Sequence, residues 1–317
     1  MNIIAVDPGF GNTKVCVEGR VAVLQSAVVR PVEMGGAALG MRVADAACRV
    51  SFEGYEFMVG AGAWRWGRPL DSLDFGAIVG PGRLALMYAA LANVAQPGDL
   101  GDCRLVIGLP VPLMLDEVQM AATKETLRKL KRPHVFTTAA GEYRFTVAAL
   151  SAVAQPAGAF HDWLYNDELL PREGGARGNI AVLDLGMNTL DLFVIEDGVV
   201  QPVRLGGDTV GVRSLLGLIS SNGYELAELD DQIRAGKLRP RDTDLDIWLG
   251  EVMHIVEKAW GKKLTRFKVV IVAGGGAVLL GRKLEGALAA KGAALHWPAD
   301  PVATNVKGLW KYGVKHG

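Results

Sequence analysis

The chain carries two short segments whose residue types and spacing suit the binding of a phosphate chain. The first is Asp7-Pro-Gly-Phe-Gly-Asn-Thr-Lys14, which follows a short apolar stretch. A tight turn containing Gly9 and Gly11 can direct several backbone N–H groups into one concavity, where side chains would obstruct a phosphate. Lys14 adds a charge for phosphate oxygens, and Asp7 is suited to holding Mg²⁺ through water. Taken alone, an ordinary glycine-containing hairpin explains the segment equally well.

The second segment, Asp184-Leu-Gly-Met-Asn-Thr-Leu-Asp191, repeats this layout in the other half of the chain. In both segments an aspartate is followed by a glycine-bearing turn and then a threonine. The residue seven positions after the leading aspartate is Lys14 in one and Asp191 in the other. Two facing hairpins can hold a polyphosphate from both sides, and their leading aspartates can share one Mg²⁺. The pair is therefore much more specific than either segment alone.

A third segment places Gly274, Gly275 and Gly276 directly after the apolar run Val270-Ile-Val-Ala273. Glycines after a buried strand let the backbone pass close to a flat ligand such as an adenosine. Many strand–helix connections look like this, so the segment is informative only because it follows the two hairpins in this order.

These segments need strands and helices that position them. Short apolar or alternating runs predict strands at residues 2–7, 13–18, 104–110, 143–153, 179–184, 190–195 and 267–273. Helical composition and spacing predict helices at residues 82–96, 114–131, 160–164, most of 209–265, and 305–313. Residues 19–80 read as short alternating segments with turns, Gln155-Pro-Ala-Gly158 as a break, and residues 166–178 as a polar surface loop.

The repeated strand–aspartate–turn–strand pattern predicts two similar α/β halves with a cleft between them. Each half would place its aspartate at the carboxyl end of a strand, where open α/β sheets usually bind ligands. We expect one domain from residues 1–154 together with 304–317, and a second from residues 155–303.

Composition restricts the function classes. The 317 residues contain 34 Lys plus Arg and 34 Asp plus Glu, so the formal net charge is zero and direct nucleic-acid binding is not expected. Cys16, Cys48 and Cys103 lie far apart, which argues against a disulfide framework or a zinc site and fits a reducing cytosol. With no signal-peptide pattern and no apolar run long enough to span a bilayer, we expect a cytoplasmic protein without membrane association.

The three segments resemble the phosphate-1, phosphate-2 and adenosine motifs of the actin, Hsp70 and sugar-kinase superfamily. Within it, the chain resembles the plasmid-segregation actins of the ParM/StbA type and their archaeal relatives. The resemblance is carried by Asp184–Asp191, Ile107-Gly-Leu-Pro110, Ala154-Gln-Pro-Ala-Gly158 and the tail Ala303-Thr-Asn-Val-Lys-Gly-Leu-Trp-Lys-Tyr312. It spans nearly the whole chain but is thin over residues 20–100. It implies an actin-like ATPase fold, with two ribonuclease H-like α/β domains around a nucleotide cleft.

The resemblance also implies roles for individual residues. Gln155 takes the place of a polar residue linked to hydrolysis, where its amide would orient the attacking water, or it only spaces a turn before Pro156. Asp184 would share the catalytic role, and Asp7 and Asp184 would hold the metal. The expected nucleotide-binding residues are Asp7, Gly9, Gly11, Asn12, Thr13, Lys14, Gly186, Met187, Asn188, Thr189, Asp191, Gly207, Gly274, Gly275 and Gly276.

The function implied by the resemblance is an ATPase that binds ATP, or GTP, with Mg²⁺ and polymerises into dynamic filaments for plasmid or DNA segregation. Its partners would be further copies of itself and a separate DNA-binding adaptor. The alternative is a small-molecule kinase on the same scaffold, although no acidic residue is clearly placed as a substrate-side base. An Hsp70-like chaperone is less consistent with the sequence, which lacks a peptide-binding domain; a scaffold that binds ATP without cleaving it is a further alternative.

Overall fold

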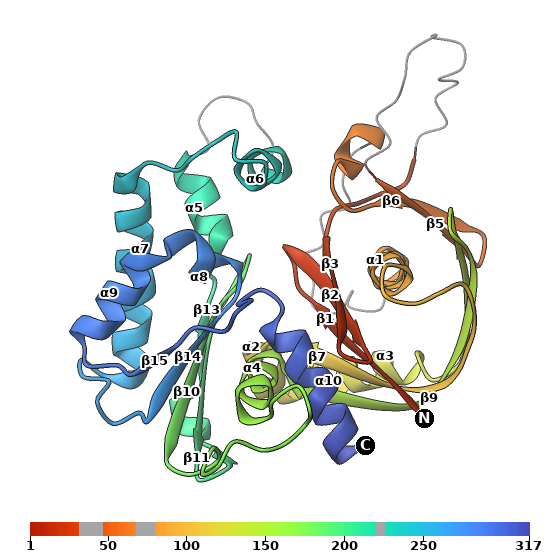
Figure 1. Cartoon of the computed structure of the whole chain (residues 1–317). Helices are drawn as coiled ribbons and strands as arrows, with labels where there is room; N and C mark the ends of the chain where they lie inside the picture. Colours follow the sequence, from red (N-terminus) through yellow and green to blue (C-terminus); the bar gives the residue numbers. More distant parts are fainter. Residues whose placement is uncertain (32–46, 68–79, 220–225) are drawn as a thin grey trace.

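The computed structural model contains two β-sheets with two helices packed between them (Figure 1). It describes four ranges of the chain, which are residues 1–31, 47–67, 80–219 and 226–317. Parts of the expectations for residues 19–80 and 209–265 therefore lie outside the described residues. None of the helices in the described ranges is long and apolar enough to cross a membrane.

The first sheet is formed by the N-terminal half of the chain, and its strand order is β3-β2-β1-β7-β9-β8-β5-β6-β4. Its strands are β1 (Asn2–Pro8), β2 (Asn12–Val17), β3 (Arg20–Gln25), β4 (Val28–Val29), β5 (Cys48–Phe52), β6 (Tyr55–Val59), β7 (Gly98–Leu109), β8 (Pro133–Thr138) and β9 (Gly141–Ala154). The helical segments of this half are η2 (Ala63–Trp66), α1 (Pro81–Ala92), α2 (Val111–Leu115) and α3 (Glu117–Arg128). The sheet curves around α1, whose buried side chains form much of the local core (Figure 1).

The second sheet has the order β12-β11-β10-β14-β15, with β13 paired to β11. Its strands are β10 (Asn179–Leu185), β11 (Leu190–Glu196), β12 (Val199–Val200), β13 (Gly206–Asp208), β14 (Val269–Ala273) and β15 (Leu295–His296). The helical segments of this half are η4 (Pro202–Arg204), α5 (Val212–Ile219), α6 (Leu226–Arg234), α7 (Asp242–Trp260), α8 (Gly275–Leu280) and α9 (Arg282–Ala290). The central strands β10 and β14 are apolar over most of their length because both faces of the sheet are covered.

The two sheets repeat one local arrangement around their first hairpins. β1 pairs antiparallel with β2 and parallel with β7, and β10 pairs antiparallel with β11 and parallel with β14. The register places Asp7 opposite Lys14 in the first hairpin and Asp184 opposite Asp191 in the second. The seven-residue spacing seen in the sequence therefore corresponds to a cross-strand pair at the same position in each hairpin.

The helices α4 (Gln155–Leu164) and α10 (Thr304–His316) lie between the sheets and pack against each other (Figure 1). α4 covers a face of the second sheet, and α10 packs on the first sheet against β1, β2 and β7. The helices approach closely through glycines, since a Cβ at Gly308 would lie 1.7 Å from the carbonyl oxygen of Gly158. α10 thus brings the C-terminal segment back to the first sheet. The domain boundaries stay a prediction.

Two helix expectations differ from the structure. The expected helix 114–131 is two helices, α2 and α3, with Asp116 between them as the N-cap of α3, where its side chain accepts a hydrogen bond from Gln119 N. The expected break at Gln155-Pro-Ala-Gly158 is the first turn of α4. Proline fits the first turn of a helix because the N–H that it lacks has no helical partner there.

Candidate active site

A cleft between the two sheets collects most of the residues singled out from the sequence. Its volume, including the open mouth, is about 1260 Å³. The turns of the two hairpins meet in it, because a Cβ at Gly11 would lie 2.9 Å from Cβ of Met187. The lining residues predicted from the sequence are Asp7, Gly9, Gly11, Asn12, Lys14, Gln155, Asp184, Gly186, Met187, Asn188, Thr189, Asp191, Gly274 and Gly275.

Asp7 is fully buried and has a partner on each carboxylate oxygen. Lys14 Nζ donates to Asp7 Oδ2 at 2.7 Å, and Gln155 Nε2 donates to Asp7 Oδ1 at 2.7 Å. Burial alone would lower the pKa of Lys14, but the carboxylates of Asp7 and Asp184 raise it above the usual range for lysine. Lys14 is therefore a cation in the cleft, held at a fixed position by Asp7.

Asp184 faces the same cleft from the second sheet and is also buried. Asn305 Nδ2, from the first turn of α10, donates to Asp184 Oδ2 at 2.6 Å. Burial raises the pKa of Asp184 to about 6, an effect that Lys14 opposes and Asp7 reinforces. These couplings follow from the closeness of both leading aspartates and one lysine within a buried site.

Asp191 is the most strongly perturbed carboxyl group at the site. Burial, followed by the charge of Asp184, raises its pKa to about 7, while a hydrogen bond from Thr189 Oγ1 at 2.9 Å to Asp191 Oδ2 opposes the shift. Asp191 Oδ1 is buried and has no hydrogen-bond partner among the described residues. Such an oxygen is stabilised by a proton, by a cation or by a ligand group that donates a hydrogen bond to it.

The donor set fits Mg²⁺ held by few protein ligands. Mg²⁺ prefers oxygen ligands and usually keeps several waters, so one or two carboxylates are sufficient. Asp7 and Asp184 supply carboxylates from opposite walls, and the buried Oδ1 of Asn305 also lacks a hydrogen-bond partner among the described residues. Within the described ranges no group of three or more His, Cys, Asp or Glu side chains forms a dedicated metal cage. Asp7 and Asp184 are the residues that would hold the ion.

Packing requires a glycine at two of the three positions after β14. Gly274 has a φ of +91°, and a Cβ there would lie 2.2 Å from the carbonyl oxygen of Leu185. A Cβ at Gly276 would lie 2.6 Å from Cγ of Leu185, whereas one at Gly275 would meet nothing within 4 Å. Gly275 is therefore the position of the three where the backbone borders open space.

The family model described as the actin like proteins N terminal domain matches residues 5–158. No curated protein matches the chain significantly. Among solved structures, the archaeal actin homolog Ta0583 has a TM-score of 0.77 and 18% identity, with 100% of each chain covered. Its complex with ADP has a TM-score of 0.71 and 17% identity, again covering 100% of each chain. The 15-stranded ParM filament from Clostridium botulinum has a TM-score of 0.74 and 16% identity, covering 99% of each chain.

This chain has the actin-like fold. The predicted fold and the predicted resemblance to ParM proteins and archaeal actin relatives are confirmed. The identities are low enough that these structures establish the fold, while the roles of the residues in the cleft stay predictions.

Three predicted residues of the actin-like chain do not line the cleft. Thr13 points to the other side of β2, where its hydroxyl lies 2.9 Å from that of Ser26. Gly276 packs against β10 within α8. Gly207 lies on β13 opposite Asp191, and a Cβ there would lie 3.3 Å from Asp191 Oδ1. The positions of Gly207 and Gly276 give them close-packing roles beside cleft residues.

Several polar residues of the cleft wall are not predicted from the sequence. Arg83 comes from α1, Asp230 and Arg234 from α6, and Asn305 from α10. Each stands in an ordinary helical context, so no local motif marks it. Asn305 lies within residues 303–312, a segment that carries the family resemblance. That resemblance is the one signal in the sequence that points to Asn305.

α6 reaches across the mouth of the cleft to the first half of the actin-like chain. Arg234 donates to Asn12 Oδ1 at 2.8 Å and to the carbonyl oxygen of Gly11 at 3.4 Å. Asp231 accepts hydrogen bonds from Gln25 Nε2 at 2.5 Å and from Trp64 Nε1. The two halves therefore touch at the mouth as well as through α4 and α10.

Proposed function

We propose that this actin-like protein binds ATP with Mg²⁺ between its two hairpins and hydrolyses it. The proposal rests on the close approach of the two hairpin turns, which places Asp7, Lys14 and Asp184 around one cleft. The chain length and fold match an archaeal actin homolog whose structure is known with ADP. A shared fold does not establish a shared function, so the proposal rests on the residues of the cleft.

The residues suit the separate tasks of phosphate transfer to water. Backbone N–H groups of the two turns and Lys14 would hold the phosphates, and Mg²⁺ when bound would neutralise charge that develops on them. Gln155 donates its amide N–H to Asp7, so its Oε1 is left to accept a hydrogen bond from the attacking water. A neutral amide orients the water but is a poor base, which predicts slow turnover.

Phosphate release from ATP in the presence of Mg²⁺ and absence of any acceptor tests this function. Asp184→Ala should lower turnover by at least ~100-fold, the scale on which loss of one group that stabilises transition-state charge is felt. Asp7→Ala should weaken binding or turnover in the same assay. Asp244→Ala is the matched control, because Asp244 is equally buried but lies in α7, paired with Arg241.

Wild-type rates in both cleft variants would refute the site. Formation of ADP that requires a small-molecule acceptor, with the phosphoryl group transferred to that acceptor and no phosphate released, would instead identify the alternative, a kinase. Repeating the assay with GTP decides the preference between the two nucleotides.

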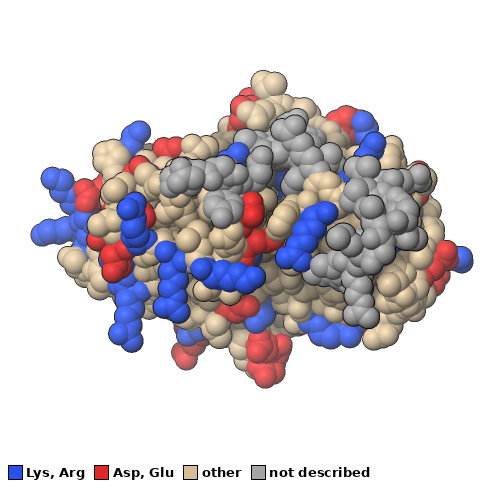
Figure 2. All heavy atoms as spheres, turned by 90° about the horizontal axis from the view of Figure 1, so that it is seen from above, with Lys and Arg blue, Asp and Glu red and all other residues tan. Residues whose placement is uncertain are grey.

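We further propose that the nucleotide-bound protein assembles into filaments that serve plasmid or DNA segregation in the cytoplasm. The support is the fold shared with a ParM filament from Clostridium botulinum. Basic and acidic side chains are interspersed over the described surface of the face in Figure 2, and the formal net charge is zero. Such a surface favours a separate DNA-binding adaptor over direct contact with DNA. Nucleotide-dependent pelleting tests assembly, and protein that stays in the supernatant at every concentration would contradict it.

A further inference from the structure

The hydrogen bond from Gln155 to Asp7 has a counterpart in the second half of the chain. α4 begins with Gln155 directly after β9 of the first sheet, and Gln155 Nε2 donates to Asp7 Oδ1 at 2.7 Å. Asn305 is the second residue of α10, and its Nδ2 donates to Asp184 Oδ2 at 2.6 Å. In both halves, therefore, a side-chain amide from the first turn of a helix between the sheets donates to the leading aspartate of the hairpin.

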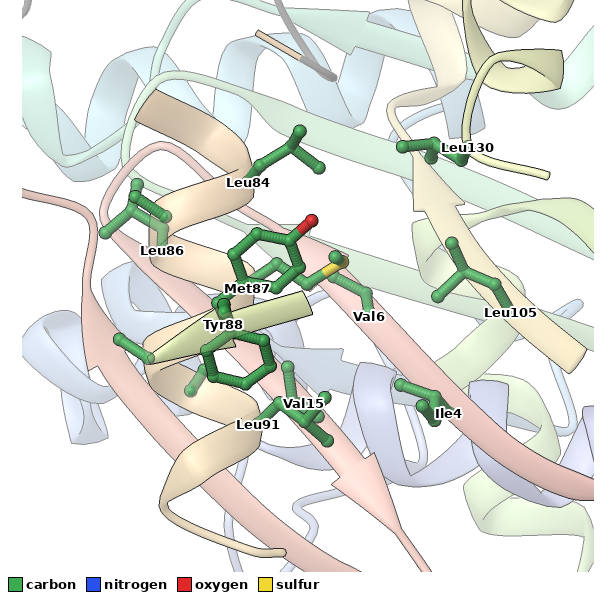
Figure 3. Packing of buried hydrophobic residues seen from close by; sticks show 14 of the residues in the cluster. Ile4, Val6, Val15, Leu84, Leu86, Met87, Tyr88, Leu91, Leu105 and Leu130 are labelled. Atoms are coloured by element: carbon green, nitrogen blue, oxygen red, sulfur yellow. The ribbon is translucent and has the colours of Figure 1, made fainter. Parts of the chain in front are cut away.

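The alternation of side chains along the strands turns both aspartates toward these helices. Figure 3 shows Val6 of β1 packed in one cluster with side chains of α1, which lies on one face of the first sheet. Ala5 packs on the other face, against α10, and Asp7 lies on that face two residues later. In the second sheet Val182 packs against α4, and Asp184 lies on the same face two residues later.

Asn305 is held in position by the crossing of α10 with α4. A Cβ at Gly158 would lie 2.2 Å from the carbonyl oxygen of Asn305, so the two backbones are in contact at this point. Thr304 Oγ1 donates to Asp162 Oδ2 at 2.8 Å, and Lys311 Nζ donates to Asp162 Oδ1 at 2.7 Å. Thr304 and Lys311 are buried, so these contacts are shielded from water. None of these contacts uses the side chain of Asn305.

The packing of the fold does not account for an amide at this position. The side chain of Asn305 is buried, and its Oδ1 has no hydrogen-bond partner among the residues that the structure describes. A buried acceptor without a partner costs free energy, whereas an apolar side chain of the same shape would avoid that cost. The bond from Nδ2 to Asp184 is the contact that requires an amide. The reason for an asparagine therefore lies in what this bond does to Asp184.

The bond from Asn305 fixes Asp184 in a way that suits a metal ligand. It engages Oδ2 of Asp184, while a Cβ at Gly274 would lie 2.6 Å from Oδ1, so a glycine there keeps the second oxygen uncovered. Carboxylates that bind metals are commonly oriented by a hydrogen bond from a neighbouring side chain, and loss of that neighbour typically lowers metal affinity by about 10–100-fold.

We infer that Asn305 is a positioning residue, which holds the carboxylate of Asp184 in the orientation that binds the metal. The inference rests on the proposed nucleotide-binding function, in which Asp184 is one of the two residues that hold Mg²⁺. It gives different tasks to the two amides of the repeat: Gln155 orients the attacking water, whereas Asn305 supports metal binding. Loss of the Asn305 amide should therefore weaken metal binding and leave the protein folded.

The test measures metal affinity directly. Wild type, Asn305→Leu and Asn305→Ala are each saturated with AMPPNP, a non-hydrolysable ATP analogue, and titrated with Mn²⁺, which accepts the same oxygen ligands as Mg²⁺. The EPR signal of free Mn²⁺ gives the fraction that is not bound. Both variants remove the donor, and Asn305→Leu also keeps the approximate shape of the side chain. Each should bind Mn²⁺ about 10–100-fold more weakly than wild type.

Asn179 offers a matched control on the strand that carries Asp184. It is the first residue of β10, its Nδ2 donates to the carbonyl oxygen of Arg266 at 3.5 Å, and its Oδ1 is likewise buried without a partner among the described residues. Asn179 does not line the cleft. Asn179→Ala therefore removes the same kind of side chain, and its Mn²⁺ affinity should equal that of wild type.

Urea unfolding in EDTA without nucleotide shows whether Asn305 has a structural role instead. Asn305→Leu loses the bond to Asp184 but also removes the unpaired Oδ1, and these two changes oppose each other. Its unfolding midpoint should therefore stay close to that of wild type. A lowered midpoint together with an unchanged Mn²⁺ affinity would show that Asn305 only stabilises the fold, and this result overturns the inference.

The outcomes separate this inference from the proposed function. A wild-type protein that binds no Mn²⁺ with AMPPNP overturns both. Normal wild-type binding, with Mn²⁺ affinities of both Asn305 variants within about twofold of wild type, overturns the role of Asn305 alone. Equal losses in Asn305→Ala and Asn179→Ala also overturn it, because the loss would not depend on the bond to Asp184. If Asn305→Leu does not fold, Asn305→Ala decides by the same criterion.

Discussion

At the scale of single residues, the buried carboxyl groups of the cleft should make the stability of the nucleotide-free protein depend on pH. Burial raises the pKa of Asp191 from 3.8 to about 7. Between these values the folded protein holds a proton that the unfolded chain releases. The contribution of Asp191 to the free energy of unfolding is therefore full below pH 4 and is lost as the pH rises toward 7, by about 1.4 kcal/mol per pH unit.

Asp191→Asn should remove this dependence, because the amide stays neutral and keeps the shape of the side chain. Urea unfolding in the presence of EDTA, from pH 5 to pH 8, measures how the free energy of unfolding depends on pH. The variant should be more stable than wild type at pH 8, with a difference that shrinks toward pH 5. Asp184, whose pKa is about 6, also titrates in this range in both proteins, and its charge is one cause of the raised pKa of Asp191. Two parallel curves would contradict a buried, protonated Asp191.

What the sequence reveals at this scale depends on how local the signal is. Asp7 and Asp184 were predictable, because each heads a glycine turn within a few residues of its strand partner. Arg83 and Asn305 were not, because their helices bring them to the cleft from distant parts of the chain. Gly274 is an intermediate case. The sequence predicts that the backbone passes close to a ligand at this position, and the structure shows that it also passes close to Leu185 of the neighbouring strand.

At the scale of elements, the crossing of α4 and α10 should not tolerate a methyl group. A Cβ at Gly158 would lie 2.2 Å from the carbonyl oxygen of Asn305. Gly158→Ala should lower the free energy of unfolding by about 1–3 kcal/mol or more, the usual cost of overpacking. Gly250 in α7 is the control, since a Cβ there meets nothing within 4 Å. Gly250→Ala should stabilise by roughly 0.5–1 kcal/mol, as expected in a helix interior.

A second element-scale prediction concerns the contact of α6 with η2. Trp64→Phe keeps an aromatic side chain, although a smaller one, and removes the N–H that donates to Asp231. Since a hydrogen bond to a charged group contributes about 1.5–3 kcal/mol when shielded and less when partly exposed, release of bound ADP should accelerate by roughly three- to tenfold. Stopped-flow chase of a fluorescent ADP analogue measures the rate.

Trp66 provides the comparison within the same short helix. Its Nε1 makes no hydrogen bond with the described residues, so Trp66→Phe removes no such contact. Its release rate should equal that of wild type. Similar acceleration in both variants would show that η2 acts through its general packing and not through Asp231.

The helix boundaries show why elements were harder to predict than strands. The strands that carry the hairpins are short apolar runs, and burial on both faces makes such runs easy to recognise. Gln155-Pro-Ala-Gly158 was read as a break because proline and glycine interrupt helices in general. Here Pro156 occupies the first turn and Gly158 faces α10, so both residues serve the helix and its crossing. That information lies in the partner helix, not in the local sequence.

At the scale of the whole molecule, a nucleotide in the cleft would join two sheets that otherwise meet through α4, α10 and the contacts of α6. Ligand that binds only the folded state stabilises it by about 2.7 kcal/mol at one hundred times its dissociation constant. Because both walls contribute to the proposed site, this stabilisation should appear in both halves. Trp66 reports on the first half, and Trp248 and Trp260 are buried in the second.

Urea unfolding followed by fluorescence should then show a nucleotide-dependent shift of the same size from either set of tryptophans. Variants that keep only Trp66, or only Trp248 and Trp260, separate the two signals. Asp184→Ala in each background should remove most of the shift, since the contribution of the second wall to metal binding is lost. A shift confined to one half would mean that the ligand binds one wall without closing the cleft. Nucleotide could not then control the relative position of the two halves, on which assembly would depend.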